Sequence, residues 1–174
     1  MCRWSSTGAI KPDWKFLFAH PAHVLALGFG AGLSPVAPGT FGTLVAIPLA
    51  AVLRPWGDGV FAAAIVAFAV IGVWAADVTG RDLGESDHGA IVWDEVVAFL
   101  LVLFFVGDDR MHVAFGFLLF RLFDIVKPPP IRWLDRTVKG GFGAMLDDFA
   151  AAGYALIAFA IGSTVGVTAR KRTY

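Results

Sequence analysis

The sequence predicts an all-α, compact, multi-helical integral membrane protein, in which helical hairpins and polar loops meet at one membrane face. Composition is the first reason. The chain is 57% hydrophobic and 16% charged, with a mean hydropathy of +0.72, whereas soluble domains have roughly 45–50% and 25%. The second reason is that the acidic residues gather at the edges of apolar segments. At 174 residues the chain falls within the usual size of one domain.

The totals and the two ends of the chain set further limits. Residues 1–27 mix basic and aromatic side chains, as an interfacial segment does, residues 28–169 form the helical membrane domain, and residues 170–174 are a basic tail. The net charge is zero, so no basic surface indicates nucleic-acid binding. Cys2 is the single cysteine, which excludes an internal disulfide and a cysteine zinc cluster.

A glycine-rich stretch, residues 28–43, comes next. Its glycines and prolines argue against a regular helix. Glycine lets backbone N–H groups approach an anion, and hydroxyls add donors, so a phosphate cradle is one interpretation. A re-entrant turn or tight helix packing explains the glycines equally well. The candidate phosphate-binding residues are Ser34, Gly39, Thr40 and Thr43.

Five apolar segments follow, at residues 44–53, 59–76, 96–106, 113–120 and 149–169. The second and fifth approach the roughly 20 residues that cross a bilayer. Pairing the first with the second and the third with the fourth as hairpins, with tips at 54–58 and 107–111, leaves every polar cluster on one face. The shorter members must then extend through Phe41 and His112 or cross partly. The basic C-terminus favours the cytoplasmic side, which conflicts with a fully spanning last helix.

Paired acids at the edges of apolar segments are the main functional signal. Asp94 and Glu95 begin the third segment, and Asp147 and Asp148 precede the fifth. Carboxylates facing hydrocarbon cost several kcal/mol or more unless they are paired, protonated or bound to a cation. We therefore expect these four to serve a site. Supporting polar residues come from the loop upstream of the first pair: Asp82, Asp87 and His88.

A second polar group alternates in charge along one predicted helix. Arg121, Asp124 and Lys127 follow at i, i+3 spacing and share a face, and prolines 128–130 then end the helix. An ion pair that neutralises itself is one interpretation. The other is an arginine and a lysine that bind phosphate oxygens.

Hard oxygen ligands without a cysteine or histidine cluster indicate magnesium rather than zinc. Magnesium uses one or two carboxylates, keeps waters and bridges to substrate phosphate. The acids, the Arg/Lys pair and the glycine-threonine loop together predict metal-assisted chemistry on a phosphate.

Four stretches in order resemble the phosphatidylglycerophosphatase A family, over residues 28 to about 153. They are Gly-Phe-Gly-Ala-Gly-Leu-Ser-Pro-Val-Ala-Pro-Gly-Thr, Ile-Val-Trp-Asp-Glu, Arg-Leu-Phe-Asp-Ile-Val-Lys-Pro-Pro-Pro-Ile-Arg and Gly-Gly-Phe-Gly-Ala-Met-Leu-Asp-Asp. Ala98 and Ala152 stand where that family usually has glycine, and each adds a methyl group at a helix contact.

The resemblance implies a magnesium-dependent lipid phosphatase of phospholipid synthesis that hydrolyses phosphatidylglycerophosphate to phosphatidylglycerol and phosphate. It implies the bacterial cytoplasmic (inner) membrane, with the site facing the cytoplasm. We expect Asp94, Glu95, Asp147 and Asp148 to hold or orient magnesium with Asp124 beside them, and Arg121, Lys127 and the 39–43 backbone to bind phosphate. The nucleophile is either water or an aspartate. The alternative function is an ion-coupled transporter with buried carboxylates.

Overall fold

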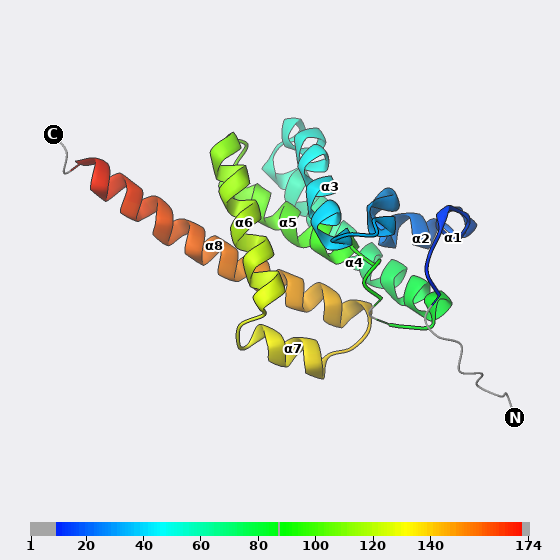
Figure 1. Cartoon of the computed structure of the whole chain (residues 1–174). Coiled ribbons are helices and arrows are strands. Elements are labelled where there is room, and N and C mark those ends of the chain that lie inside the picture. The colour runs from blue at the N-terminus through cyan, green and yellow to red at the C-terminus, as the bar shows by residue number, and fades with distance from the viewer. Residues whose placement is uncertain (1–9, 87, 172–174) are drawn as a thin grey trace, which may run out of the picture.

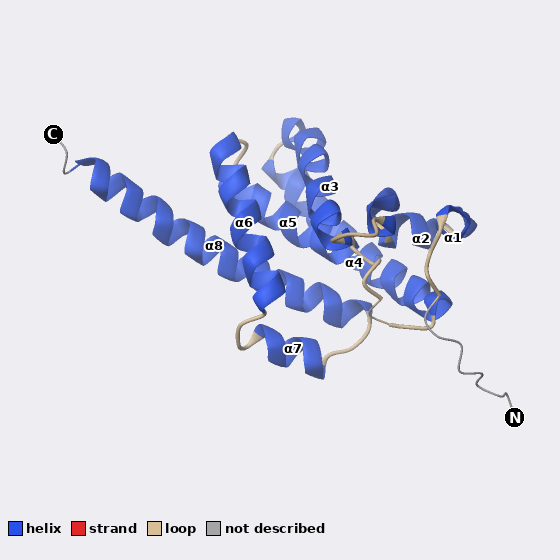
Figure 2. Cartoon of the chain, viewed as in Figure 1, coloured by secondary structure: helices blue, strands red, loops and turns tan. Residues whose placement is uncertain are grey.

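The computed structural model describes residues 10–86 and 88–171, and throughout this part of the chain the regular structure is helical (Figure 2). Short helices come first, and the longer helices α3, α4, α5, α6 and α8 follow, with the short α7 between α6 and α8 (Figure 1). In order they are α1 (Trp14–Ala19), α2 (Pro21–Ala26), η1 (Gly28–Leu33), α3 (Pro38–Leu53), η2 (Arg54–Trp56), α4 (Asp58–Leu83), α5 (Trp93–Val106), α6 (Arg110–Val126), α7 (Ile131–Thr137) and α8 (Gly141–Lys171). The predicted all-α class is confirmed.

Three helical segments are long and apolar enough to cross a bilayer: Pro38–Trp56, Asp58–Leu83 and Gly141–Ser163. The surface of α4 supports this, because Val66 and Val70 are about two-thirds exposed and no polar group accompanies them over residues 59–76. Apolar side chains that face outward over this length suit a lipid environment. The first apolar segment is longer than the sequence indicated, since its helix starts at Pro38.

The predicted hairpins are present. A tight turn at η2 joins α3 to α4, and residues 107–109 join α5 to α6. As expected for the shorter members, α3 includes Phe41 and α6 includes His112. The two tips meet away from the acidic clusters, where the Arg54 guanidinium donates to the Leu103 carbonyl oxygen at 2.6 Å. A cation at this point also suits the carboxyl end of α5.

Asp109 starts the second helix of the α5–α6 hairpin. Its side chain accepts hydrogen bonds from the backbone N–H groups of His112 and Met111. These bonds favour the ionised form and lower the pKa of Asp109. The turn therefore ends in a capped helix.

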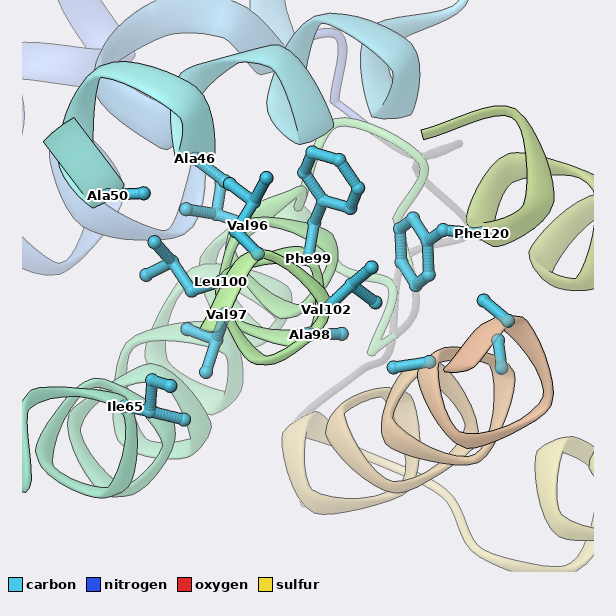
Figure 3. Close-up of a cluster of buried hydrophobic side chains, with 14 of the residues drawn as sticks. Ala46, Ala50, Ile65, Val96, Val97, Ala98, Phe99, Leu100, Val102 and Phe120 are labelled. Atoms are coloured by element: carbon cyan, nitrogen blue, oxygen red, sulfur yellow. The ribbon is translucent and has the colours of Figure 1, made fainter. Parts of the chain in front are cut away.

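The core is built around α5, which is apolar on all sides beyond its first turn (Figure 3). Val96 and Leu100 face Ala46 and Ala50 of α3, while Val97 lies on the side toward Ile65 of α4. Phe99 packs on Phe120 of α6, with ring centroids 5.6 Å apart. The helices α3, α4, α6 and α8 all contact α5. The first turn of α5 is therefore held at the centre of the bundle.

The two alanines that depart from the resemblance lie in this core. Ala98 and Ala152 are both fully buried, and Ala98 stands on the side of α5 turned toward α8 (Figure 3). Both methyl groups are accommodated in the packed core.

Two helix boundaries differ from the sequence-based expectation. The 28–43 stretch is not a loop throughout, because Pro38 begins α3 and Gly39 and Gly42 lie inside it. Proline is preset for a first helical turn. The last helix begins at Gly141, so Asp147 and Asp148 lie inside α8 and not at its start. Asp77 of α4 accepts from the Gly141 N–H at 2.7 Å.

Gly72 tests the packing of α4 against α5. A methyl group added there meets Cδ1 of buried Trp93 at 2.5 Å, whereas at Gly153, also inside a helix, nothing lies within 4 Å. We expect Gly72→Ala to lower the free energy of unfolding by about 1–3 kcal/mol and Gly153→Ala to raise it by up to ~1 kcal/mol. Thermal or denaturant unfolding in detergent measures both. An equal increase in the free energy of unfolding for both variants would contradict the close contact between Gly72 and Trp93.

Candidate active site

Arg121 of α6 is the centre of a polar cluster that joins three helices. Its Nη1 lies 2.6 Å from Asp124 Oδ2, 3.1 Å from Glu95 Oε1 and 3.4 Å from Thr43 Oγ1. The side chains of Arg121, Glu95 and Asp124 are 14%, 16% and 11% exposed. Charges this far from water are stabilised by one another, so the guanidinium fixes the first turns of α3 and α5 against the last turn of α6.

Local geometry explains how the residues meet. Arg121 and Asp124 are one turn apart on α6, and Glu95 belongs to the first turn of α5. The Thr43 hydroxyl donates to the Gly39 carbonyl oxygen at 2.8 Å, which leaves its oxygen available to accept from Arg121. Gly39 is required because a Cβ atom there would overlap the Glu95 carboxylate. One glycine of the glycine-rich stretch thus makes room for the charged cluster.

Lys127 forms the second cationic contact. It ends α6 in a left-handed conformation, with φ 44°, and its Nζ donates to Asp147 Oδ2 of α8 at 2.5 Å. The lysine side chain is 29% exposed and the aspartate 5% exposed. This pair therefore stands at the more accessible edge of the cluster.

Crowded carboxyl groups mark the interior of the cluster. Asp148 is 4% exposed, and Asp94, Asp124, Glu95 and Asp147 all act on it electrostatically. Glu95 Oε2 and Asp148 Oδ2 are buried and meet no hydrogen-bond donor in the described part of the chain; Arg121 Nε is buried and meets no acceptor. In the described part of the chain, two carboxyl groups of this crowded cluster, Glu95 and Asp148, therefore each keep an oxygen atom that a cation can bind.

The structure brings together most, not all, of the residues singled out from sequence. Within reach of one another are Asp94, Glu95, Arg121, Asp124, Lys127, Asp147, Asp148, Gly39 and Thr43. Thr40 lies in the same first turn of α3. The remaining residues are held elsewhere or fall outside the described residues.

Ser34, Asp82 and His88 make other contacts. Ser34 Oγ donates to the Val36 carbonyl oxygen at 2.8 Å, and His88 Nδ1 accepts from the Ala90 N–H at 3.2 Å. Asp82 ends α4 and lies 2.9 Å from Nε2 of His23. Asp87 lies outside the described residues. The contacts given for Ser34, Asp82 and His88 therefore lie outside the Arg121 cluster.

Most glycines of the 28–43 stretch pack against that loop. Added methyl groups would strike Val92 at Gly28 and Gly42, and the Ala90 carbonyl at Gly32. These contacts favour the tight-packing interpretation for the three glycines. They hold residues 90–92, shortly before Asp94, against η1 and the start of α3.

Trp93 is a positioning residue that the sequence analysis did not single out. Its indole N–H donates to the Phe68 carbonyl oxygen at 3.1 Å, and the ring also contacts Gly72. The first turn of α5 is thereby fixed beside the apolar middle of α4. The place of Trp93 directly before the paired acids was the sequence signal that could have identified it. Its partner, Phe68, is distant in sequence, so the contact itself could not be predicted.

The charge imbalance predicts opposite stability effects for two substitutions. Arg121→Gln leaves Glu95 and Asp124 uncompensated and should lower the free energy of unfolding by about 3 kcal/mol. Asp148→Asn removes one of the crowded carboxylates and should raise the midpoint of thermal unfolding. Both are measured in detergent with a chelator present. A fall for Asp148→Asn comparable to that for Arg121→Gln would contradict a carboxylate excess.

Comparison with known proteins gives a consistent result. The sequence profile of the family described as phosphatidylglycerophosphatase A matches residues 24–163. Phosphatidylglycerophosphatase A of Escherichia coli K12 is 44% identical over 140 residues, which cover 79% of this chain and 80% of the relative. The Haemophilus influenzae protein of the same name is 41% identical over 149 residues, 84% of this chain and 91% of the relative.

A third relative has a different name. A putative phosphatidylinositol-3-phosphatase of Bacteroides thetaiotaomicron is 39% identical over 155 residues, 82% of this chain and 93% of the relative. No solved structure matches the chain. All three relatives are named as lipid phosphatases, and none as a transporter. The expected family and enzyme class are confirmed: the chain belongs to the phosphatidylglycerophosphatase A family, phosphoric monoester hydrolases of phospholipid synthesis.

Proposed function

We propose that the chain hydrolyses the terminal phosphate monoester of phosphatidylglycerophosphate at the Arg121 cluster. The observation that carries this proposal is the meeting of a buried Arg121–Glu95–Asp124 contact with unpartnered carboxylate oxygens and Lys127. Such a set of groups serves both the binding of a phosphate and its charge neutralisation. Family membership supplies the lipid substrate.

Arg121 and Lys127 bind the phosphate in this proposal. Among the described residues the buried Arg121 Nε meets no acceptor, so a phosphate oxygen would satisfy it. The Nη1 atom stays on Glu95 and Asp124, which fixes the orientation of the guanidinium. Lys127, at the accessible edge, would move from Asp147 to a second phosphate oxygen. The start of α3, which carries Gly39, Thr40 and Thr43, lies beside this position, since Thr43 Oγ1 is 3.4 Å from Arg121 Nη1.

The acidic residues fit a magnesium ion. The donors are hard carboxylate oxygens, and two of them, Glu95 Oε2 and Asp148 Oδ2, are buried and meet no hydrogen-bond partner within the described residues. Among the described residues no three candidate ligands stand close enough to hold a metal by themselves. That suits magnesium, which keeps waters and completes its shell with substrate phosphate. We propose that one or two of Asp94, Glu95, Asp147 and Asp148 would bind the ion directly and the others would orient it through water, and a bound ion would neutralise charge on the phosphate oxygens.

In the hydrolysis, an oxygen nucleophile forms a new bond to phosphorus, the bond from phosphorus to the glycerol oxygen breaks, and that oxygen gains a proton. The protein's own contribution is positioning and charge. Arg121 holds the phosphoryl group in a site largely closed to water, and the carboxyl cluster provides groups that accept and return a proton. Asp124 acts on Arg121 and is a positioning residue.

We also place the protein in the bacterial inner membrane with this site toward the cytoplasm. The three candidate spans support membrane insertion. The starts of α3, α5 and α8 and the ends of α4 and α6 share one face, through the contacts of Arg121 and of Asp77 with Gly141. The hairpin tips at residues 54–58 and 107–109 then face the periplasm.

Phosphate release from phosphatidylglycerophosphate by purified protein in detergent tests the reaction. We expect release with magnesium, loss with chelator, and a fall on the order of 100-fold or more for Glu95→Gln and for Arg121→Gln. Asp108→Asn changes an exposed acid at the distal tip and serves as the matched control. Full activity of Glu95→Gln, or equal activity with chelator, would exclude the proposed site or its metal. Phosphatidylinositol 3-phosphate as a second substrate tests the headgroup preference.

Thiol labelling tests the orientation. In a Cys2→Ser background, Asp108→Cys should react with an impermeant reagent in intact spheroplasts, because it lies on the exposed periplasmic tip. Glu85→Cys, which is exposed near the end of α4, should react only in inverted vesicles. The reverse labelling pattern would place the site on the periplasmic side.

A further inference from the structure

We propose that α1 is an interfacial membrane anchor, whose Trp14 and Phe18 insert at the boundary of headgroups and acyl chains in the leaflet that the site faces. This surface is separate from the phosphatase chemistry. The family match begins at residue 24, so α1 lies outside it. The proposed partner is a lipid surface that contains anionic phospholipid.

The outward face of α1 is aromatic. Trp14 and Phe18 are 63% and 74% exposed, and their stacked rings have centroids 6.4 Å apart. Their i, i+4 spacing places them on one side of the helix, while Leu17 is fully buried against the protein. Two large rings held together and away from the core are costly in water and favourable at a bilayer interface.

His23 of α2 links α1 to the end of α4. His23 Nδ1 lies 2.8 Å from the Phe16 carbonyl oxygen, and its Nε2 lies 2.9 Å from Asp82 Oδ2. The Phe16 ring stacks on His23 at 4.0 Å. Before α1, the Ile10 N–H donates to the Leu83 carbonyl oxygen at 3.2 Å. The aromatic face is therefore presented in a fixed direction.

The position of α4 sets the depth of α1 in the bilayer. The apolar residues 59–76 rise about 27 Å at 1.5 Å per residue, close to the ~30 Å hydrocarbon core. Exposed tryptophans stand near both ends of this length, Trp56 and Trp74. His20, which directly follows α1, lies 6.2 Å from Trp74 between ring centroids. Figure 1 shows α1 and α2 beside this end of α4, so α1 lies at interfacial depth.

Two features argue for lipid as the occupant. The lipid-facing side chains of α4 lead to Trp74 and from there to His20 and α1, so the surface continues one that the bilayer already covers. Lys11 and Lys15 are exposed beside the aromatic face. Their long side chains reach the phosphate level while their stems lie on apolar surface, which suits an anionic leaflet.

Depth-dependent fluorescence quenching tests the anchor without reference to activity. In a Cys2→Ser background, Phe18→Cys is labelled with an environment-sensitive fluorophore and placed in nanodiscs with one protein copy each. The lipids are phosphatidylcholine with or without phosphatidylglycerol, and carry nitroxides at shallow or deep positions. Val66→Cys on the outer face of α4 is the deep control, and Glu85→Cys is the aqueous control.

The anchor predicts a blue-shifted emission for Phe18→Cys, a loss of fluorescence that is greater with shallow than with deep nitroxides, and protection from iodide. The shift should increase with phosphatidylglycerol. Emission and iodide quenching like those of Glu85→Cys would overturn the proposal, as would a blue shift without nitroxide quenching, which indicates contact with protein. Trp14→Cys, measured in the same way, must give the same result.

Discussion

The rest of the structure depends on the contact between Arg121 and Glu95. The start of α5 and the end of α6 place carboxylates in an apolar bundle, and the Arg121 guanidinium pairs with both of them. Its Nη1 reaches α3 through Thr43, α5 through Glu95 and its own helix through Asp124. A buried pair of this kind contributes little net stability but strongly disfavours any other arrangement of the three helices.

Close backbone approach is the second constraint, and it follows from the first. The Glu95 carboxylate occupies the space where Gly39 lacks a side chain, and Val92 fills the space beside Gly28 and Gly42. The glycine-rich stretch therefore has two roles: Gly39 makes room for the charged cluster, and Gly28 and Gly42 allow close packing. A phosphate that binds at Arg121 would meet a first turn of α3 whose backbone is already pressed against the start of α5.

The carboxyl groups of the site are crowded while the core around it is rigid. Asp94, Glu95, Asp124 and Asp147 all act electrostatically on Asp148. The helix α5, which supplies two of these acids, packs against α3, α4, α6 and α8 through buried apolar residues (Figure 3). A movement of α5 that separated the carboxylates and reduced their repulsion would therefore disrupt the packed core, at a cost in free energy. A rigid scaffold that holds unsatisfied oxygen atoms in place is the arrangement expected for a site that recruits a cation and an anionic substrate together.

The sequence by itself determined the helical membrane class, the hairpins and the family, because hydropathy, segment length and four ordered motifs are local properties. It also identified the residues that gather around Arg121. Only the tertiary structure decided their partners: which carboxylate pairs with Arg121, that Lys127 reaches Asp147, that Asp82 belongs to His23, and that Asp77 meets Gly141 at the start of α8. Such pairings join residues far apart in the chain, and packing alone selects among partners that are chemically equivalent.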